Sequence, residues 1–280
     1  MIHDEKTFTS EKDATIYYQS WKPDGAPRSA IVVVHGLAEH SGRYERFARH
    51  FVEHGFAVFA LDHPGHGRSS GTPGHVGRFS EYLASLDQLR SKIAEEMPGL
   101  PRVLLGHSLG GLISTSYLLQ NQDAFLGCIL SGPAIKANVE PAAFQMKLIR
   151  FLSRALPRTG ALRLDSRGVS RDPEEVKRYV EDPLVYNGKL SARLVAELFD
   201  EMQHVQSEAA RITLPLLILH GGADPMASPD GSRFLDERVA SRNKTLEIYP
   251  GLYHEIFNEP EREQVFDDIL RWLDELLDRD

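Results

Sequence analysis

A serine lies within a pattern of glycines that is typical of nucleophilic catalysis. The pattern Gly-x-Ser-x-Gly occupies residues 106–110, with Ser108 at its centre. An apolar run at 103–105 precedes it, and a helix-compatible run at 112–119 follows it. Glycines at these places let a strand turn sharply into a helix, and that turn lifts the serine hydroxyl above the edge of the sheet. An ordinary glycine-rich turn is the alternative, but the flanking strand and helix favour Ser108 as a nucleophile.

A base and a carboxylate follow the serine in the order that such chemistry uses. A serine hydroxyl is a weak nucleophile near neutral pH, so a base must take its proton and a carboxylate must orient that base. Asp224 and His254 each come just after a predicted strand, in the chain order Ser, Asp, His. Asp230 and Asp236 are alternatives to Asp224, but only Asp224 directly follows a strand. We therefore predict that Ser108, His254 and Asp224 form a catalytic triad.

Acyl transfer also needs backbone N–H groups that face the negative oxygen of the tetrahedral intermediate. One donor is usually the residue after the nucleophile, and the other lies in the loop after an earlier strand. Those positions are Leu109 and Leu37. Gly36 permits the backbone to turn an N–H towards the site. The alternative for this loop is a plain connection between a strand and a helix.

Short β-branched runs alternate with segments of helical period along most of the chain. This alternation predicts an α/β fold with a mostly parallel sheet. Several strands are apolar without alternation, as in strands that helices cover on both faces. Helices are predicted at 44–52 and at 265–277. Strands are predicted at 30–34, 56–61, 103–105, 126–130, 214–220 and 245–249.

The stretch 134–212 breaks this alternation. It lacks a convincing central strand, and its helical pattern is interrupted by prolines at 141, 157, 173 and 183. We predict that residues 1–133 and 213–280 form the α/β core. Residues 134–212 are predicted to be an inserted helical cap.

The first part of the predicted cap combines an amphipathic helix with basic charge. Residues 136–167 contain seven basic and two acidic side chains, a local charge of +5 in a chain of net charge −8. We hypothesise that this helix rests on a lipid or micelle surface. The alternative is that it buries its apolar arc on the core. That arc contains Phe144, Leu148, Ile149, Phe151, Leu152, Ala155 and Leu156, whereas Lys147, Arg150 and Arg154 lie on the other side.

Composition excludes several other classes of protein. A chain of 280 residues with 41% hydrophobic side chains is long enough to bury a substantial core. The negative net charge and the absence of a basic block argue against nucleic-acid binding. Cys128 is the single cysteine, so no disulfide can form within the chain. No window approaches the roughly 20 apolar residues of a membrane-spanning helix, and we expect a cytoplasmic protein with peripheral membrane association left open.

No cofactor or metal is expected. His63 and His66 lie in a Pro-Gly turn without a matching set of further ligands. The sequence contains neither a P-loop nor a strand-linked dinucleotide fingerprint. The oligomeric state is left open.

Taken together, these motifs resemble the monoacylglycerol lipases, within the lysophospholipase-like serine hydrolases of the α/β-hydrolase superfamily. The resemblance spans nearly the whole chain and rests on residues 35–44 (HGLAEHSGRY), 62–69 (DHPGHGRS), 106–110 (GHSLG), 222–224 (GAD) and 253–254 (YH). It implies an α/β-hydrolase fold and a cap with an apolar acyl tunnel. It also implies a lipid ester as the small-molecule substrate, with hydrolysis of a single-chain glyceride to a fatty acid and glycerol.

The resemblance further implies candidate contacts with the glycerol headgroup. By position these are Glu39 and Arg43, whose alternative role is a surface ion pair between residues four apart. The segment 182–186 looks like part of the family's cap, without an assigned contact. Three other functions stay open: a carboxylesterase for short esters, a lysophospholipase, and a ligand receptor that does not turn its ligand over.

Overall fold

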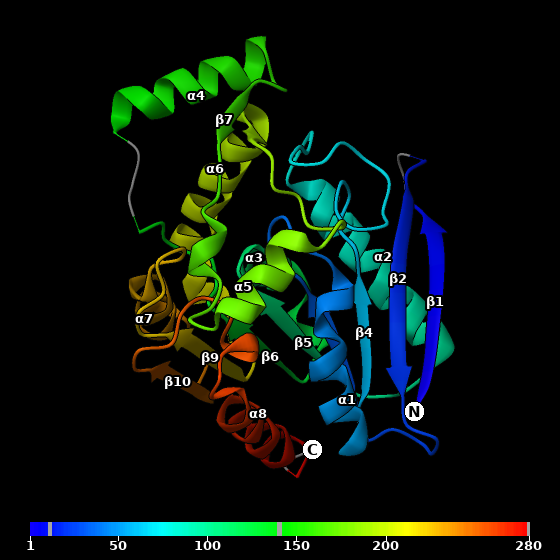
Figure 1. The fold of residues 1–280 in the computed structure, drawn as a ribbon. Coiled ribbons are helices and arrows are strands. Elements are labelled where there is room, and N and C mark those ends of the chain that lie inside the picture. Colours follow the sequence, from blue (N-terminus) through cyan, green and yellow to red (C-terminus); the bar gives the residue numbers. More distant parts are fainter. Residues whose placement is uncertain (11–12, 139–141, 279–280) are drawn as a thin grey trace.

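A mostly parallel sheet organises the computed structural model, which describes residues 1–10, 13–138 and 142–278 (Figure 1). The strand order is β1-β2-β4-β3-β5-β6-β9-β10. All pairs from β4 to β10 are parallel, whereas β1 with β2 and β2 with β4 are antiparallel. The strands are β1 (Ile2–Thr9), β2 (Thr15–Lys22), β3 (Ala30–Val34), β4 (Ala57–Leu61), β5 (Arg102–His107), β6 (Gly127–Ser131), β9 (Leu216–Gly221) and β10 (Lys244–Tyr249).

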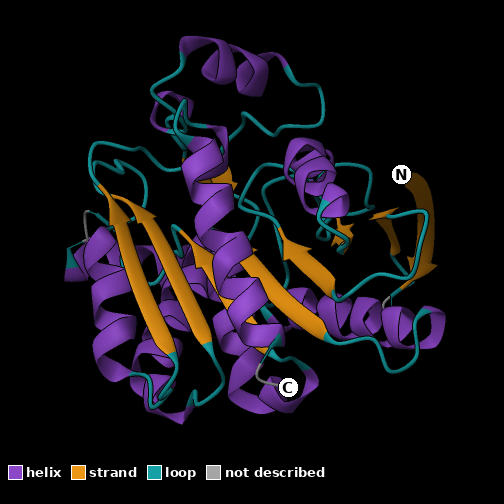
Figure 2. Ribbon diagram, turned by 90° about the horizontal axis from the view of Figure 1, so that it is seen from below, coloured by secondary structure: helices purple, strands orange, loops and turns teal. Residues whose placement is uncertain are grey.

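Helices cover both faces of the sheet (Figure 2). Ile31 and Val33 of β3 belong to one apolar cluster, with side chains of α1 (Glu45–Glu53) and α8 (Arg262–Leu277). Val32 and Val34 belong to the opposite cluster, with α2 (Ser80–Glu96), α3 (Leu109–Asn121) and α7 (Pro229–Arg238). Because both faces of the strand are buried, its sequence shows no polar alternation.

The six predicted strands are all present, with ends that shift by at most two residues. The antiparallel hairpin of β1 and β2 was not predicted. Its outer strand, β1, has the sequence IHDEKTFT and is mostly exposed at the edge of the sheet. Charged side chains on an edge strand protect it from pairing with other chains, but they also remove the apolar signal by which a strand is recognised.

Residues between β6 and β9 form α4 (Ala143–Ala155), β7 (Gly160–Leu162), α5 (Pro173–Glu181), β8 (Leu190–Ser191) and α6 (Ala192–Glu208). Of the described residues here, the only strands are β7 and β8, which pair with each other in a separate small sheet. Figure 1 shows α4 at one end of the molecule, packed on α6. Pro141, where we predict the first helix of this stretch to begin, lies outside the described residues. Short 3-10 turns are η1 (Ser41–Tyr44), η2 (Gln122–Ala124), η3 (Ser166–Gly168), η4 (Ala209–Arg211) and η5 (Ile256–Asn258).

Candidate active site

Ser108 occupies a strained turn between β5 and α3. Its backbone has φ +54° and ψ −117°, a conformation that non-glycine residues rarely adopt. Gly110 makes the turn possible, because a Cβ atom there would lie 1.8 Å from the carbonyl oxygen of Val34. Strain of this kind persists at functional sites where the surrounding structure holds it in place.

His254 lies between Ser108 and Asp224. Its Nε2 is 2.8 Å from Ser108 Oγ, and its Nδ1 is 2.6 Å from Asp224 Oδ2. A carboxylate only accepts hydrogen bonds, so Nδ1–H donates to Asp224 and Nε2 is free to accept the serine O–H. Of the three carboxylates that the sequence offers for this role, Asp224 is the one bonded to His254. Asp230 instead pairs with Arg233 on α7.

Asp224 receives four hydrogen bonds. Oδ1 accepts the N–H groups of Met226 at 2.7 Å and Ala227 at 3.0 Å. Oδ2 accepts from His254 and also from His220 Nε2 at 3.0 Å. Burial alone would raise the pKa of Asp224, but the charge of His254 and the two histidine hydrogen bonds outweigh burial and hold that pKa well below its usual range.

The interaction with Asp224 shifts the pKa of His254 in the opposite direction, upwards. Burial alone would lower the pKa of this imidazole. The charge and the hydrogen bond of Asp224 outweigh burial, so the pKa of His254 is raised above the ordinary 6.5. Asp224 therefore favours the imidazolium that forms when His254 takes a proton.

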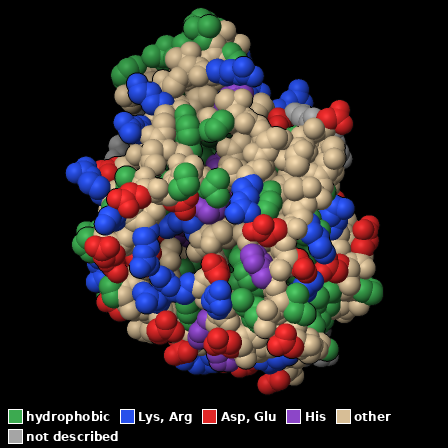
Figure 3. All heavy atoms as spheres, turned by 45° about the vertical axis from the view of Figure 1, so that its right-hand side comes forward, with side chains coloured by type: hydrophobic (Ala, Val, Ile, Leu, Met, Phe, Trp, Pro, Cys, Tyr) green, Lys and Arg blue, Asp and Glu red, His purple; other side chains and the backbone are tan. Residues whose placement is uncertain are grey.

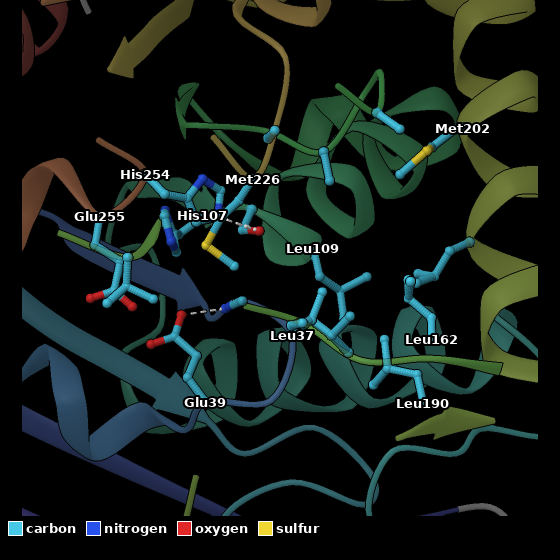
Figure 4. A pocket seen from close by; sticks show the side chains of 18 of the residues that line it. Leu37, Glu39, His107, Leu109, Leu162, Leu190, Met202, Met226, His254 and Glu255 are labelled. Atoms are coloured by element: carbon cyan, nitrogen blue, oxygen red, sulfur yellow. Dashed lines mark hydrogen bonds between the residues drawn. The ribbon is translucent and has the colours of Figure 1, made fainter. Parts of the chain in front are cut away.

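Leu37 and Leu109 lie next to each other at the centre of the pocket beside Ser108 (Figure 4). Leu109 is the first residue of α3, where backbone N–H groups lack a partner within the helix. The loop that contains Leu37 approaches Ser108 closely, since a Cβ atom on Gly36 would lie 3.2 Å from the Cβ of Ser108. The Gly36 N–H donates to Glu39 Oε1 at 2.6 Å, which fixes this loop. That the backbone N–H groups of Leu37 and Leu109 bind the oxyanion remains a proposal.

The pocket over Ser108 has a polar end and an apolar end. Its empty volume is about 900 Å³ including the open mouth. Glu39, His107, His254 and Glu255 lie towards one end, whereas Leu162, Leu190 and Met202 lie at the other (Figure 4). The apolar walls come from the stretch between β6 and β9, including Leu162, Leu164, Leu190, Leu198, Phe199 and Met202.

Arg43 forms buried ion pairs with both Glu39 and Glu255. The alternative of a surface pair between Glu39 and Arg43 is therefore wrong. Arg43 Nη1 is 2.9 Å from Glu39 Oε2 and 2.6 Å from Glu255 Oε1, and Nη2 is 2.7 Å from Glu255 Oε2. Glu39 lines the main pocket, whereas Arg43 lines a smaller cavity behind it. Burial, together with the charge of Glu255, raises the pKa of Glu39, and Arg43 opposes that shift. Whether either residue contacts a headgroup stays a proposal.

Three residues at the site were not predicted. His220 donates to Asp224, Glu255 pairs with Arg43, and the ring of His107 lies 4.8 Å from that of His254. Each is adjacent or close in sequence to a predicted residue, and that proximity is the one signal that could have identified them. Burial and the neighbouring His254 lower the pKa of His107 to about 3, so it stays neutral.

The chain is similar to known proteins in both sequence and fold. Residues 25–261 match the Hydrolase_4 family, described as serine aminopeptidase, S33. A monoacylglycerol lipase of Mycolicibacterium smegmatis is 41% identical over 269 residues, which cover 96% of each chain. The chain belongs to the monoacylglycerol lipase family.

Other members of the monoacylglycerol lipase family agree with this assignment. The human monoglyceride lipase is 36% identical over 261 residues, which cover 92% of this chain and 86% of the relative. The crystal structure of the Paleococcus ferrophilus monoacylglycerol lipase has a TM-score of 0.84 at 36% identity, covering 95% of this chain and 99% of the other. The predicted resemblance and the α/β-hydrolase fold are thereby confirmed.

Two properties of the described residues concern metal binding and membrane spanning. Among residues 1–10, 13–138 and 142–278, no group of three or more His, Cys, Asp or Glu side chains has a metal-binding arrangement. Over the same ranges, every helix is too short or too polar to span a bilayer.

Proposed function

We propose that this protein hydrolyses monoacylglycerols to a fatty acid and glycerol, with Ser108, His254 and Asp224 as the catalytic triad. The observation that supports this most directly is the row of hydrogen bonds from Asp224 through His254 to Ser108, which ends at the pocket. Membership of the monoacylglycerol lipase family supports the substrate.

The reaction proceeds through an acyl-enzyme. His254 Nε2 takes the proton of Ser108 as Oγ forms a bond to the ester carbonyl carbon. The N–H groups of Leu37 and Leu109 stabilise the oxyanion. The C–O bond to glycerol then breaks, and glycerol leaves with the proton from His254. Water attacks the acyl-enzyme as His254 takes a proton from it. The bond between the acyl carbon and Ser108 Oγ then breaks, His254 returns the proton to Oγ, and the fatty acid is released.

The two ends of the pocket match the two ends of such a substrate. An acyl chain placed towards Leu162, Leu190 and Met202 loses its contact with water, which stabilises the complex. The glycerol part then faces Glu39, whose carboxylate accepts hydroxyl hydrogen bonds. Arg43 acts on the headgroup indirectly, because it holds Glu39 from behind.

We also propose that residues 134–212 act as a cap over the core and that α4 contacts lipid surfaces. Phe144 is 71% exposed and Phe151 is 65% exposed, with Leu148 also exposed on the same helix. Figure 3 shows hydrophobic side chains gathered at the tip of the molecule, where Figure 1 places α4, with Lys and Arg side chains below them. A basic amphipathic helix of this kind favours anionic membrane surfaces. The alternative of an apolar arc buried on the core does not fit these exposures.

The decisive experiment combines one variant with a series of esters. Ser108→Ala is expected to lower kcat by about 10⁴- to 10⁶-fold while folding normally, because triad members act as a unit. More than a few per cent residual ester hydrolysis would contradict the mechanism. Glycerol monoesters of increasing chain length, compared with short soluble esters, separate a lipase from a carboxylesterase, and competition by lysophosphatidylcholine tests the lysophospholipase alternative. Labelling of Ser108 by a fluorophosphonate distinguishes any of these enzymes from a receptor.

A further inference from the structure

The loop that holds the proposed oxyanion donor Leu37 is bonded to the cap. The carbonyl oxygen of Ala38 accepts the N–H of Tyr186 at 2.9 Å. His40 Nε2 lies 3.0 Å from Asp182 Oδ2. Both partners belong to the turn at 182–186, which lies between α5 and β8. A segment about 140 residues away in the chain thus contacts the residues on the C-terminal side of Leu37.

The hydrogen bonds around His40 define which of its nitrogens carries the proton. The Gly42 N–H donates to His40 Nδ1 at 3.2 Å, so Nδ1 is an acceptor. Nε2 therefore carries the hydrogen and donates to the carboxylate of Asp182. The contact is a directed hydrogen bond between buried and half-buried groups, and its strength depends on the position of the 182–186 turn.

The backbone at Ala38 requires such support. Its φ is +70°, in the left-handed region that an alanine rarely adopts. Strained conformations of this kind persist only where neighbouring contacts hold them. On the core side the loop is held by Glu39, which accepts the Gly36 N–H. On the cap side it is held by the Tyr186 N–H and by Asp182.

The 182–186 turn is itself fixed on both sides. Asp182 Oδ1 accepts the Leu184 N–H at 2.8 Å, which closes the turn. The ring of Tyr186 packs so closely on Gly74 that a Cβ atom there would lie 2.3 Å from Tyr186 Cε1. The Tyr186 hydroxyl also donates to the carbonyl oxygen of Lys189 at 3.1 Å. Because the 182–186 turn is held in this way, a displacement of the turn would also displace the loop that it contacts.

We propose that the 182–186 turn of the cap positions the oxyanion loop, with Asp182 acting through His40 and the Tyr186 N–H acting on Ala38. The inference rests on the proposed ester hydrolysis and adds a positioning role for cap residues that do not touch the substrate. The consequence is that the position of this part of the cap sets how well the Leu37 N–H faces the oxyanion.

The test compares Asp182→Ala, Asp182→Asn and the control Asp172→Ala. Asp172 is the N-cap of α5, where its side chain accepts the Glu174 N–H at 2.9 Å, so its loss perturbs the cap without touching the oxyanion loop. For a soluble short-chain glycerol ester, Asp182→Ala is expected to lower kcat about 10- to 100-fold, less than the loss of a whole oxyanion donor, with KM within about twofold of wild type. Asp182→Asn keeps one acceptor oxygen, which can accept from His40 only at the expense of the bond from the Leu184 N–H, so this variant should restore kcat in part.

Two further measurements separate positioning from a general loss of structure. The affinity for a trifluoromethyl ketone, which forms an oxyanion on Ser108, should weaken in Asp182→Ala by the same factor as kcat/KM, whereas the affinity for the fatty acid product should not change. In a double-mutant cycle with His40→Ala, the combined loss should be clearly smaller than the sum of the two single losses, because both variants remove the same hydrogen bond between His40 and Asp182.

Three results would overturn the proposal. They are an unchanged kcat in Asp182→Ala, an equal loss in Asp172→Ala, and additive losses in the cycle. A wild-type protein that hydrolyses no ester would instead reject the proposed function, so the two failures are distinguishable.

Discussion

His220 donates a hydrogen bond to the carboxylate oxygen of Asp224 that also receives His254. The distance from His220 Nε2 to Asp224 Oδ2 is 3.0 Å, and the same Nε2 lies 3.2 Å from the carbonyl oxygen of Ala227. Both neighbours are acceptors, so Nε2 carries the hydrogen, and Nδ1 accepts from the Ser232 hydroxyl at 2.7 Å. His220 is thus a second, buried hydrogen-bond donor to the Asp224 carboxylate, beside His254.

Replacing His220 tests that support. His220→Leu, which has no side-chain hydrogen-bond donor, is expected to lower kcat at least tenfold with little change in KM, because a hydrogen bond to a charged group contributes about 1.5–3 kcal/mol. Ser232→Ala is the matched control, since it removes a partner of His220 but leaves the bond to Asp224. The measurement is steady-state kinetics on a glycerol monoester, and a kcat within twofold of wild type would contradict the role.

The pH profile of activity follows from the raised pKa of His254. Only the neutral imidazole can take the proton of Ser108, so kcat/KM should fall as pH drops, with its midpoint above 6.5. Asp224→Asn removes the charge that raises this pKa, so the midpoint of its residual activity should move to lower pH, with kcat reduced about 10⁴-fold. A flat wild-type profile from pH 5 to 9 would reject His254 as the base.

A single added methyl group should disturb the oxyanion loop. In Gly36→Ala, the new Cβ would lie 2.8 Å from Glu39 Oε1 and 3.2 Å from the Cβ of Ser108, which forces the loop away from the nucleophile. We expect kcat to fall about 10²- to 10³-fold, the cost of one lost oxyanion donor. Gly25→Ala is the control, because no atom lies within 4 Å of its added Cβ. Equal kcat values in Gly36→Ala and Gly25→Ala would contradict the close approach of the Gly36 backbone to Ser108.

Binding of α4 to lipid can be measured by co-sedimentation with vesicles. The wild type should bind anionic vesicles more tightly than neutral ones, and Phe144→Ser with Phe151→Ser should reduce binding to both. Charge reversal at Lys147, Arg150 and Arg154 should abolish the preference for anionic lipid, whereas reversal at Arg49 on α1 should not. Equal binding to neutral and anionic vesicles that the triple reversal does not affect would rule out this surface.

Local patterns predicted the parts of the site that follow from chain geometry. The backbone around a glycine-flanked serine between a strand and a helix has few possible conformations. For that reason the position of Ser108 could be predicted from its sequence neighbours. The interactions of His220 and Glu255 depend on which loops contact each other in the folded chain. Strand periodicity carries no information about contacts between loops, so His220 and Glu255 were not predicted as site residues.

The helical wheel of α4 had a similar limit. It predicted which side chains share a face, but not which neighbour covers that face. In the structure the arc is divided: Ile149 is half-buried and packed against the apolar cluster, while Phe144 and Phe151 are exposed. A wheel treats these residues alike because it describes one helix without its surroundings.

Most of the apolar lining of the pocket comes from residues 162–202, whereas the side chains of Ser108, Asp224 and His254 come from other parts of the chain. Selectivity and reactivity are therefore encoded in separate stretches of sequence. Substitutions in the walls can change which esters are accepted during evolution or in the laboratory while bond cleavage is preserved. When this stretch is exchanged between relatives, the contacts of Asp182 and Tyr186 should be kept, so that the new segment still fits the loop at residues 38–40.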